Sequence, residues 1–152
     1  MMKYINVILI LIVIFILGLI FYNKFIRFTN EIPIFCYTNV KNNLPFTNND
    51  IPKSKETIIV YVSTACGSCE TTINNINKNL NRNTTYIIIT SEKDTQTSKS
   101  FFKKLLLNDE IILLNDLDNN FTKDFKLGFS IIYPTIFTFT QENKLIKVSN
   151  NF

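Results

Sequence analysis

The sequence predicts an α/β fold in which a central mixed β-sheet is flanked by helices. From residue 57 onwards, short runs rich in Ile, Val, Tyr and Phe recur along the chain, as in buried strands. Between these runs, apolar residues recur at helical spacing. Strands that alternate with helices are typical of sheets with parallel members joined by right-handed crossovers. Beyond its apolar N-terminus, the 152-residue chain is long enough for one such domain, over residues 31–152.

The apolar N-terminus, residues 5–22, predicts a membrane anchor. The stretch INVILILIVIFILGLIFY contains a single Asn among apolar residues, and it is about as long as a helix that crosses a ~30 Å bilayer core. It exceeds the roughly 7 to 15 apolar residues of a cleavable signal. We therefore expect one uncleaved transmembrane helix within an anchor and linker over residues 1–30. The basic residues Lys3, Lys24 and Arg27 flank both sides and leave its orientation open.

The composition excludes several classes of function. The 16 basic and 12 acidic residues give a net charge of +4, and the lysines are scattered, so we expect no nucleic-acid partner. The chain has no histidine, which excludes His-ligated metals and the Cys-His and Ser-His-Asp catalytic arrangements. Its three cysteines are too few for a small fold held together by disulfides. Thiols, carboxylates, amines and hydroxyls are left to carry any chemistry.

The first elements after the anchor are a hairpin, a strand and a helix. Residues 32–50 hold two β-like runs on either side of an Asn-rich turn, so we expect a hairpin with Cys36 in its first strand, as a half-buried thiol. The continuous apolar run at 57–63, TIIVYVS, is typical of a central strand that is buried on both faces. Apolar residues at helical spacing then predict a helix over 68–81.

The rest of the chain continues the alternation of strands and helices. We expect strands at 85–90, 110–116 and 134–140, a helix at 98–107 and a short helix at 119–128. The short helix is predicted from two observations: Phe121 and Phe125 are spaced at i and i+4, and Gly128 is suited to end a helix. The turn QENK then leads into a last strand, LIKVS.

Two cysteines, Cys66 and Cys69, lie where the central strand passes into its helix, in the segment VSTACGSCET. A helix N-terminus favours the thiolate through its partial positive charge and its unpaired N–H groups. Cys69 lies one helical turn beyond Cys66, close enough to attack a mixed disulfide formed there and release the partner. The spacing therefore suits dithiol–disulfide exchange.

A lone CxxC pair also has other interpretations. A structural zinc site needs about four ligands, and only Cys36 remains to help. Two unreactive buried cysteines are a further alternative, although a glycine-containing CxxC at a strand end is not a natural core pattern. Cys36 itself is interpreted as a strand thiol, with a regulatory or intermolecular disulfide as the alternative. We expect no metal and no cofactor.

The chain from about Ile32 to its end resembles the thioredoxin superfamily, most closely the membrane-anchored, TlpA/ResA-like, redoxin-type thiol–disulfide oxidoreductases of bacteria. The segment PIFCYTNVKNNLPF resembles the N-terminal hairpin of that group, and ETIIVYVSTACGSCETTI resembles its first core strand, CxxC and helix. The segment LLNDLDNNFTKDFKLGFSIIYPTIFTFT resembles the stretch that leads to a cis-proline and a strand, and QENKLIKV the closing hairpin.

This resemblance implies a thioredoxin-like fold and assigns roles to five residues. It makes Cys66 the nucleophile and Cys69 the resolving cysteine. It gives Pro134 a cis peptide bond beside the sulfurs, and it places Tyr133, Pro134 and Thr135 against the substrate polypeptide. The implied function is reduction of disulfides in extracytoplasmic proteins, at the periplasmic or outer face of the cell membrane. The implied partners are those proteins and an upstream membrane or thioredoxin-type electron donor.

The sequence departs from the family pattern at several places. Ala65 replaces the aromatic residue that commonly precedes the first cysteine, and Gly-Ser separates the cysteines where many relatives have a proline. No acidic residue lies within 57–63, so the buried carboxylate of some relatives is missing, and Glu70 is expected to point to solvent. The terminal helix that usually follows the last strand is also expected to be missing.

Two other functions remain as alternatives. A thioredoxin-like module that serves a membrane assembly without using its cysteines is favoured by the lack of a terminal helix and of a buried acid. A peroxiredoxin-type peroxidase would need a Pro-x-x-x-Thr-x-x-Cys environment with a nearby arginine. Here Ser63 stands three residues before Cys66, the proline is absent, and the arginines are Arg27 and Arg82.

Overall fold

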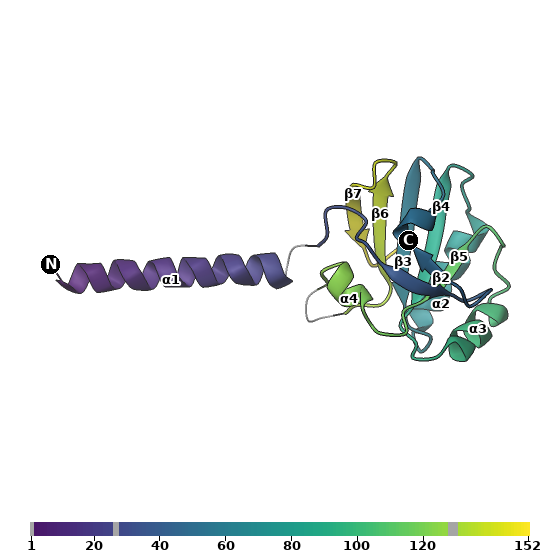
Figure 1. The fold of residues 1–152 in the computed structure, drawn as a ribbon, viewed down its shortest axis with the longest axis horizontal. Helices are drawn as coiled ribbons and strands as arrows, with labels where there is room; N and C mark the ends of the chain where they lie inside the picture. Colours follow the sequence, from purple (N-terminus) through teal and green to yellow (C-terminus); the bar gives the residue numbers. More distant parts are fainter. Residues whose placement is uncertain (1, 26–27, 128–130) are drawn as a thin grey trace.

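The computed structural model describes residues 2–25, 28–127 and 131–152. Within them, seven strands form one mixed sheet in the order β2-β1-β5-β4-β3-β6-β7 (Figure 1). The strands are β1 (Cys36–Asn39), β2 (Pro45–Thr47), β3 (Glu56–Val62), β4 (Thr84–Thr90), β5 (Ile112–Asn115), β6 (Thr135–Thr140) and β7 (Leu145–Ser149). The helices are α1 (Met2–Phe25), α2 (Gly67–Lys78), α3 (Thr95–Lys104) and α4 (Phe121–Asp124), with one turn of 3-10 helix, η1, at Asn48–Asp50.

Strands β3 and β4 form the centre of the sheet. They run parallel and pair along their whole length, with Ile59 opposite Ile87. Strand β5 continues the parallel arrangement beyond β4, and β6 lies antiparallel to β3 on the other side. The β-branched side chains of β3 and β4 favour extended backbone and are buried on both faces of the sheet. The predicted α/β class and mixed sheet are confirmed.

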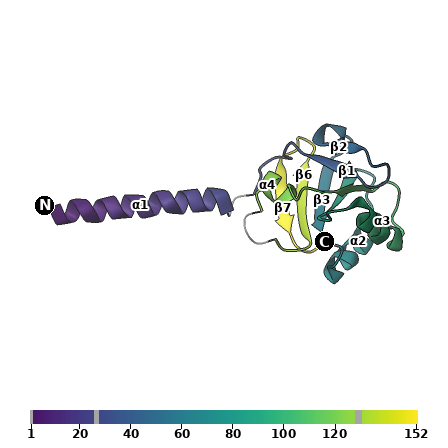
Figure 2. The same ribbon diagram turned by 60° about the horizontal axis from the view of Figure 1, so that its bottom comes forward.

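Different elements cover the two faces of the sheet. Helices α2 and α3 lie side by side over one face (Figures 1 and 2), where Ile73 and Phe102 belong to the same apolar core as β3 and β4. An aromatic cluster covers the other face. In it, Phe121 of α4 stacks between Tyr61 and Phe125, with ring centroids 4.0 Å from each. Burying one such side chain contributes about 1.5–3 kcal/mol, so the four-residue α4 is held by packing and not by its length.

The predicted N-terminal hairpin is present as β1 and β2. Asn43 supplies the positive φ, 60°, that closes the turn, and the N–H of Asn39 donates to the carbonyl of Leu44 at 2.8 Å. Cys36 is the first residue of β1, as predicted, but it is exposed and not half-buried. Strand alternation turns Tyr37 to the core and therefore turns Cys36 away from it.

Three helices have limits other than those predicted. Helix α2 ends at Lys78 and not at residue 81. Helix α3 begins at Thr95 because Asp94 caps it. The hydroxyl and the N–H of Thr97 donate to the Asp94 carboxylate at 2.6 and 2.8 Å, and they hold its pKa below the ordinary value. Helix α4 ends at Asp124, because Lys126 adopts a positive φ of 55° that does not continue a helix. The predicted stop at Gly128 lies outside the described residues.

Helix α1 precedes the sheet domain (Figure 1). The large apolar side chains described in it, within residues 8–22, are exposed by 47–66 %. Among the helices of the described residues, none is long and apolar enough to cross a membrane, so the predicted transmembrane helix over 5–22 is not shown. After this helix, the N–H of Thr29 donates to the carbonyl of Phe125 at 3.3 Å. Residues 150–152, after β7, adopt neither helix nor strand.

Candidate active site

Cys66 lies at the junction between β3 and α2. A turn of three residues follows β3, and the N–H of Cys66 donates to the carbonyl of Ser63 at 3.2 Å. Cys66 has extended backbone and caps α2, because its Sγ accepts a hydrogen bond from the N–H of Cys69 at 3.3 Å. The sulfur therefore lies at the positive end of a 12-residue helix, where N–H groups and the helix dipole favour a thiolate.

Cys66 and Cys69 form a disulfide, yet their sulfurs have different environments. Cys66 is half-buried, whereas Cys69 is fully buried and packs with the apolar side chains between α2 and the sheet. The helix turns Cys69 toward the sheet, on the same face as Ile73 one turn further on. A reactant from solution therefore reaches Cys66 first.

The pairing of β3 with β6 brings a distant loop beside Cys66. In this antiparallel pair Tyr61 lies opposite Thr135, so the residues before Thr135 lie next to the residues that follow Tyr61. The peptide bond between Tyr133 and Pro134 is cis, the geometry that the family resemblance implies. The carbonyl oxygen of Tyr133 lies 3.7 Å from the Sγ of Cys66. Residues 67 positions apart in the sequence thus meet at the sulfur.

Ser68 also lies at this meeting point. Its Oγ is 3.1 Å from the Sγ of Cys66 and 3.5 Å from the carbonyl oxygen of Tyr133. A sulfur in a disulfide carries no proton, so in the oxidised protein Ser68 is the donor in its contact with Cys66. The side chain between the two cysteines therefore contacts both the reactive sulfur and the cis-proline loop.

Further side chains hold the loops of the site together. Thr64, just before the cysteines, donates from its N–H and its hydroxyl to the carboxylate of Glu92 in the loop after β4. In the same loop, Ser91 accepts a hydrogen bond from the Tyr133 hydroxyl at 3.2 Å. Thr135 is buried, and its hydroxyl donates to the carbonyl of Ile132. Thr135 therefore stabilises the cis-proline loop from its buried side, and its side chain is not accessible to a substrate.

Acidic residues lie apart from the sulfurs or have other partners. Glu70 accepts a hydrogen bond from Lys104 at 3.0 Å on the surface. Asp116 is buried, and burial raises the pKa of its carboxyl although it accepts from the N–H groups of Asn120 and Phe121. It therefore shapes the turn before α4. In the part of the chain that the structure describes, no group of three or more Cys, Asp or Glu side chains could hold a metal ion.

A groove of about 490 Å³ lies between α2 and the cis-proline loop. One wall is formed by Ser68 and other residues of α2, and the other by Tyr133, Pro134 and residues 150–152. Two exposed apolar residues, Ile131 and Ile132, directly precede Tyr133 in the sequence. The groove adjoins Cys66, because Ser68 and Tyr133, which line it, also contact the Cys66 sulfur.

Comparison with known proteins decides the family. Residues 29–151 match the family described as Redoxin. The chain belongs to the Redoxin family. With its fold, this places it in the thioredoxin superfamily, as the sequence predicted. No curated protein matches the chain.

Solved structures with the same fold include three oxidoreductase-related proteins. A secreted disulfide oxidoreductase of Mycobacterium tuberculosis, homologous to E. coli DsbE, is 19 % identical over 78 % of this chain and 84 % of its own, with a TM-score of 0.63. A Chlorobium tepidum protein, proposed to be the thiol:disulfide interchange protein DsbE, is 14 % identical over 83 % and 86 %, with a TM-score of 0.66. An exposed lipoprotein thioredoxin of Streptococcus pneumoniae is 18 % identical over 78 % and 90 %, with a TM-score of 0.60. At these identities the likeness establishes the fold.

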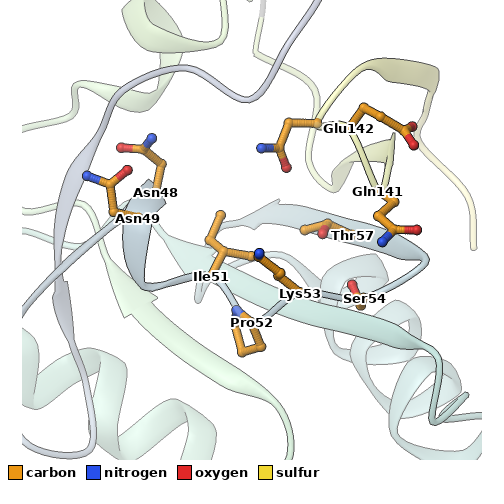
Figure 3. A pocket seen from close by; sticks show the side chains of 10 residues that line it. Asn48, Asn49, Ile51, Pro52, Lys53, Ser54, Thr57, Gln141 and Glu142 are labelled. Atoms are coloured by element: carbon orange, nitrogen blue, oxygen red, sulfur yellow. The ribbon is translucent and has the colours of Figure 1, made fainter.

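This redoxin also has a polar pocket of about 510 Å³ away from the Cys66–Cys69 pair. Figure 3 shows Asn48 and Asn49 on one side of the pocket and Gln141 and Glu142 on the other. The pocket includes Thr57, near the start of β3, whereas Cys66 follows the end of that strand. No cysteine lines it. The groove between α2 and the cis-proline loop is lined by Ser68 and Tyr133, which both contact the Sγ of Cys66.

Sequence reasoning missed several residues of the site. Ser68 was considered only as part of the dipeptide between the cysteines, and its contact with Tyr133 depends on tertiary structure. Ser91 and Glu92 were also missed. Their position in the sequence could have indicated them, because they directly follow the carboxyl end of β4. Side chains that follow neighbouring parallel strands lie together at one edge of a sheet.

The environments of the three thiols predict an order of alkylation. After reduction of the protein, we expect iodoacetamide to modify Cys36 and Cys66 quickly and Cys69 only after unfolding, because Cys69 is fully buried. Quenched samples analysed by peptide mass spectrometry measure the three rates separately. Labelling in guanidinium chloride, where all three thiols are accessible, is the control. Equal rates for Cys66 and Cys69 in the folded protein would contradict this arrangement.

Proposed function

We propose that this redoxin is a thiol–disulfide oxidoreductase that reduces disulfides of other proteins through Cys66 and Cys69. The observation that carries the proposal is the asymmetry of the pair. The accessible Cys66 lies at a helix N-terminus beside a cis-proline loop, and the buried Cys69 lies one turn behind it. Family membership and the fold support the same chemistry.

The reaction follows from this order of access. The Cys66 thiolate attacks one sulfur of a substrate disulfide, so that a mixed disulfide forms, the substrate S–S bond breaks, and the leaving thiolate takes a proton. The Cys69 thiol then loses its proton, and its thiolate attacks the Sγ of Cys66. The Cys66–Cys69 bond forms and the second substrate thiolate leaves. The substrate gains two electrons and two protons, and the dithiol is oxidised to the disulfide.

The groove supports a polypeptide substrate. An extended chain would pair its backbone with Tyr133, as in the TlpA/ResA-like proteins that the sequence resembles, and would place its disulfide at Cys66. Pro134 lines the groove beside Tyr133, while Thr135 keeps the loop in place. An upstream dithiol protein, in the membrane or of the thioredoxin type, would return the Cys66–Cys69 disulfide to the dithiol.

We also propose that residues 5–22 attach the domain to the cell membrane, with the domain on the extracytoplasmic side. The exposed apolar side chains of α1 support attachment, because a continuous apolar surface is unfavourable in water. The full chain should then sediment with membranes, and the exposed Cys36 should react with a membrane-impermeant maleimide added to intact cells. A matched chain without residues 2–25 should be found in the soluble fraction. Recovery of the full chain there as well, or labelling only after lysis, would contradict the proposal.

Single-cysteine variants test the catalytic pair. We expect Cys66→Ala to abolish reduction of a model protein disulfide, because no accessible nucleophile remains in the pair. We expect Cys69→Ala to accumulate a mixed disulfide at Cys66, because the resolving thiol is missing. Non-reducing electrophoresis with mass spectrometry detects that adduct, and Cys36→Ala is the matched control that should keep full activity.

The alternative of an accessory module that does not use its cysteines makes a different prediction for the same variants. Full cellular function of the Cys66→Ala variant would favour that module and would overturn the oxidoreductase proposal.

A further inference from the structure

Ser68 lies between two possible acceptors for its single hydroxyl proton. The Sγ of Cys66 is 3.1 Å away, and the carbonyl oxygen of Tyr133 is 3.5 Å away. A hydroxyl has one proton, so it cannot donate fully to both acceptors. The sulfur of a thiol or a disulfide is a weak acceptor, whereas a carbonyl oxygen is a good one and an ionised thiolate a strong one. The better acceptor therefore changes with the state of Cys66.

Tyr133, whose carbonyl lies beside Cys66 and Ser68, lines the groove as well. Tyr133 and Ser68 lie on its two walls, and the carbonyl faces the Cys66 sulfur at 3.7 Å. A polypeptide in the groove presents backbone N–H groups, which are stronger partners for a carbonyl than a hydroxyl at 3.5 Å. A substrate N–H that takes this carbonyl removes one of the two acceptors that compete for the Ser68 proton.

We infer that Ser68 is a positioning residue that links occupation of the groove to activation of Cys66. When a substrate N–H pairs with the Tyr133 carbonyl, the Ser68 hydroxyl donates to the Cys66 sulfur alone and stabilises the attacking thiolate. In the empty groove the proton is shared with Tyr133. The thiolate is thus stabilised most when a polypeptide is in place. This inference rests on the proposed oxidoreductase function. It adds a residue that favours polypeptide substrates, which present a backbone N–H, over other disulfides.

The location of Ser68 makes the inference testable without damage to the fold. Ser68 is an exposed residue in the first turn of α2, so Ser68→Ala removes only the hydroxyl. Ser68→Thr keeps a hydroxyl at the same position. Gly67→Ala changes the other residue of the dipeptide, and a Cβ there meets no atom within 4 Å. It is the matched control, because it alters the same turn and leaves these contacts in place.

The experiment compares two substrates that differ in two backbone N–H groups. One is a disulfide-linked peptide, and the other is the same peptide N-methylated at the residues on either side of the attacked cysteine. Stopped-flow measurement with the reduced protein gives the rate constant of thiol attack for each. We expect the parent protein to prefer the unmethylated peptide about tenfold, and Ser68→Ala to lower that preference to about twofold, a change of the size expected for one typical hydrogen bond. Ser68→Thr and Gly67→Ala should keep the tenfold preference.

The results separate this inference from the proposed function. An equal preference in the parent and in Ser68→Ala would overturn the inference, because the hydroxyl would then act independently of the substrate backbone. No preference in the parent would overturn it as well. If the parent protein reduced neither peptide, the oxidoreductase proposal itself would fail, and the inference with it.

Discussion

The antiparallel pairing of β3 with β6 is the constraint on which the rest of the site depends. It places Thr135 opposite Tyr61, and the register then fixes which residue of the cis-proline loop meets Cys66. A shift of this register by one residue would turn every side chain of β6 to the other face of the sheet. Phe137, buried in the aromatic core, and Ile136, buried under α2, both oppose such a shift. The core thus determines the geometry of the reactive sulfur.

The proposed chemistry depends on the different environments of two cysteine side chains, Cys66 and Cys69. Cys66 caps α2, where its sulfur accepts a backbone N–H and remains accessible, whereas Cys69 lies one turn later within the apolar core. In the proposed reaction, the same helix therefore supplies both the nucleophile and the resolving thiol, one helical turn apart. The carboxylate next to the pair, Glu70, is held by Lys104 at the surface. Stabilisation of the thiolate therefore falls to the helix N-terminus and to the hydroxyl of Ser68.

Local patterns predicted much of this structure. The order of strands and helices, the hairpin, and the position of Cys66 at a strand-to-helix junction follow from periodicity and spacing, which are local. The cis bond at Pro134 came from resemblance, because periodicity does not distinguish it from an ordinary proline at the start of a strand. Contacts between distant loops could not be predicted, since the meeting of Ser68 with Tyr133 depends on the β3–β6 register. The cap of α3 is a local signal as well, because an Asp such as Asp94 is a common residue before the first turn of a helix.

The reduction potential of the Cys66–Cys69 pair tests the central claim most directly. The full chain would be equilibrated with mixtures of reduced and oxidised glutathione, and the fraction of disulfide measured after acid quenching and alkylation. We expect a reversible two-electron transition near or below the potential of thioredoxin, about −270 mV, because a reductase needs a dithiol that gives up its electrons readily. A potential near −120 mV, typical of a strong oxidant, would contradict the direction of transfer. Failure of the pair to form a disulfide at any glutathione ratio would contradict the oxidoreductase itself.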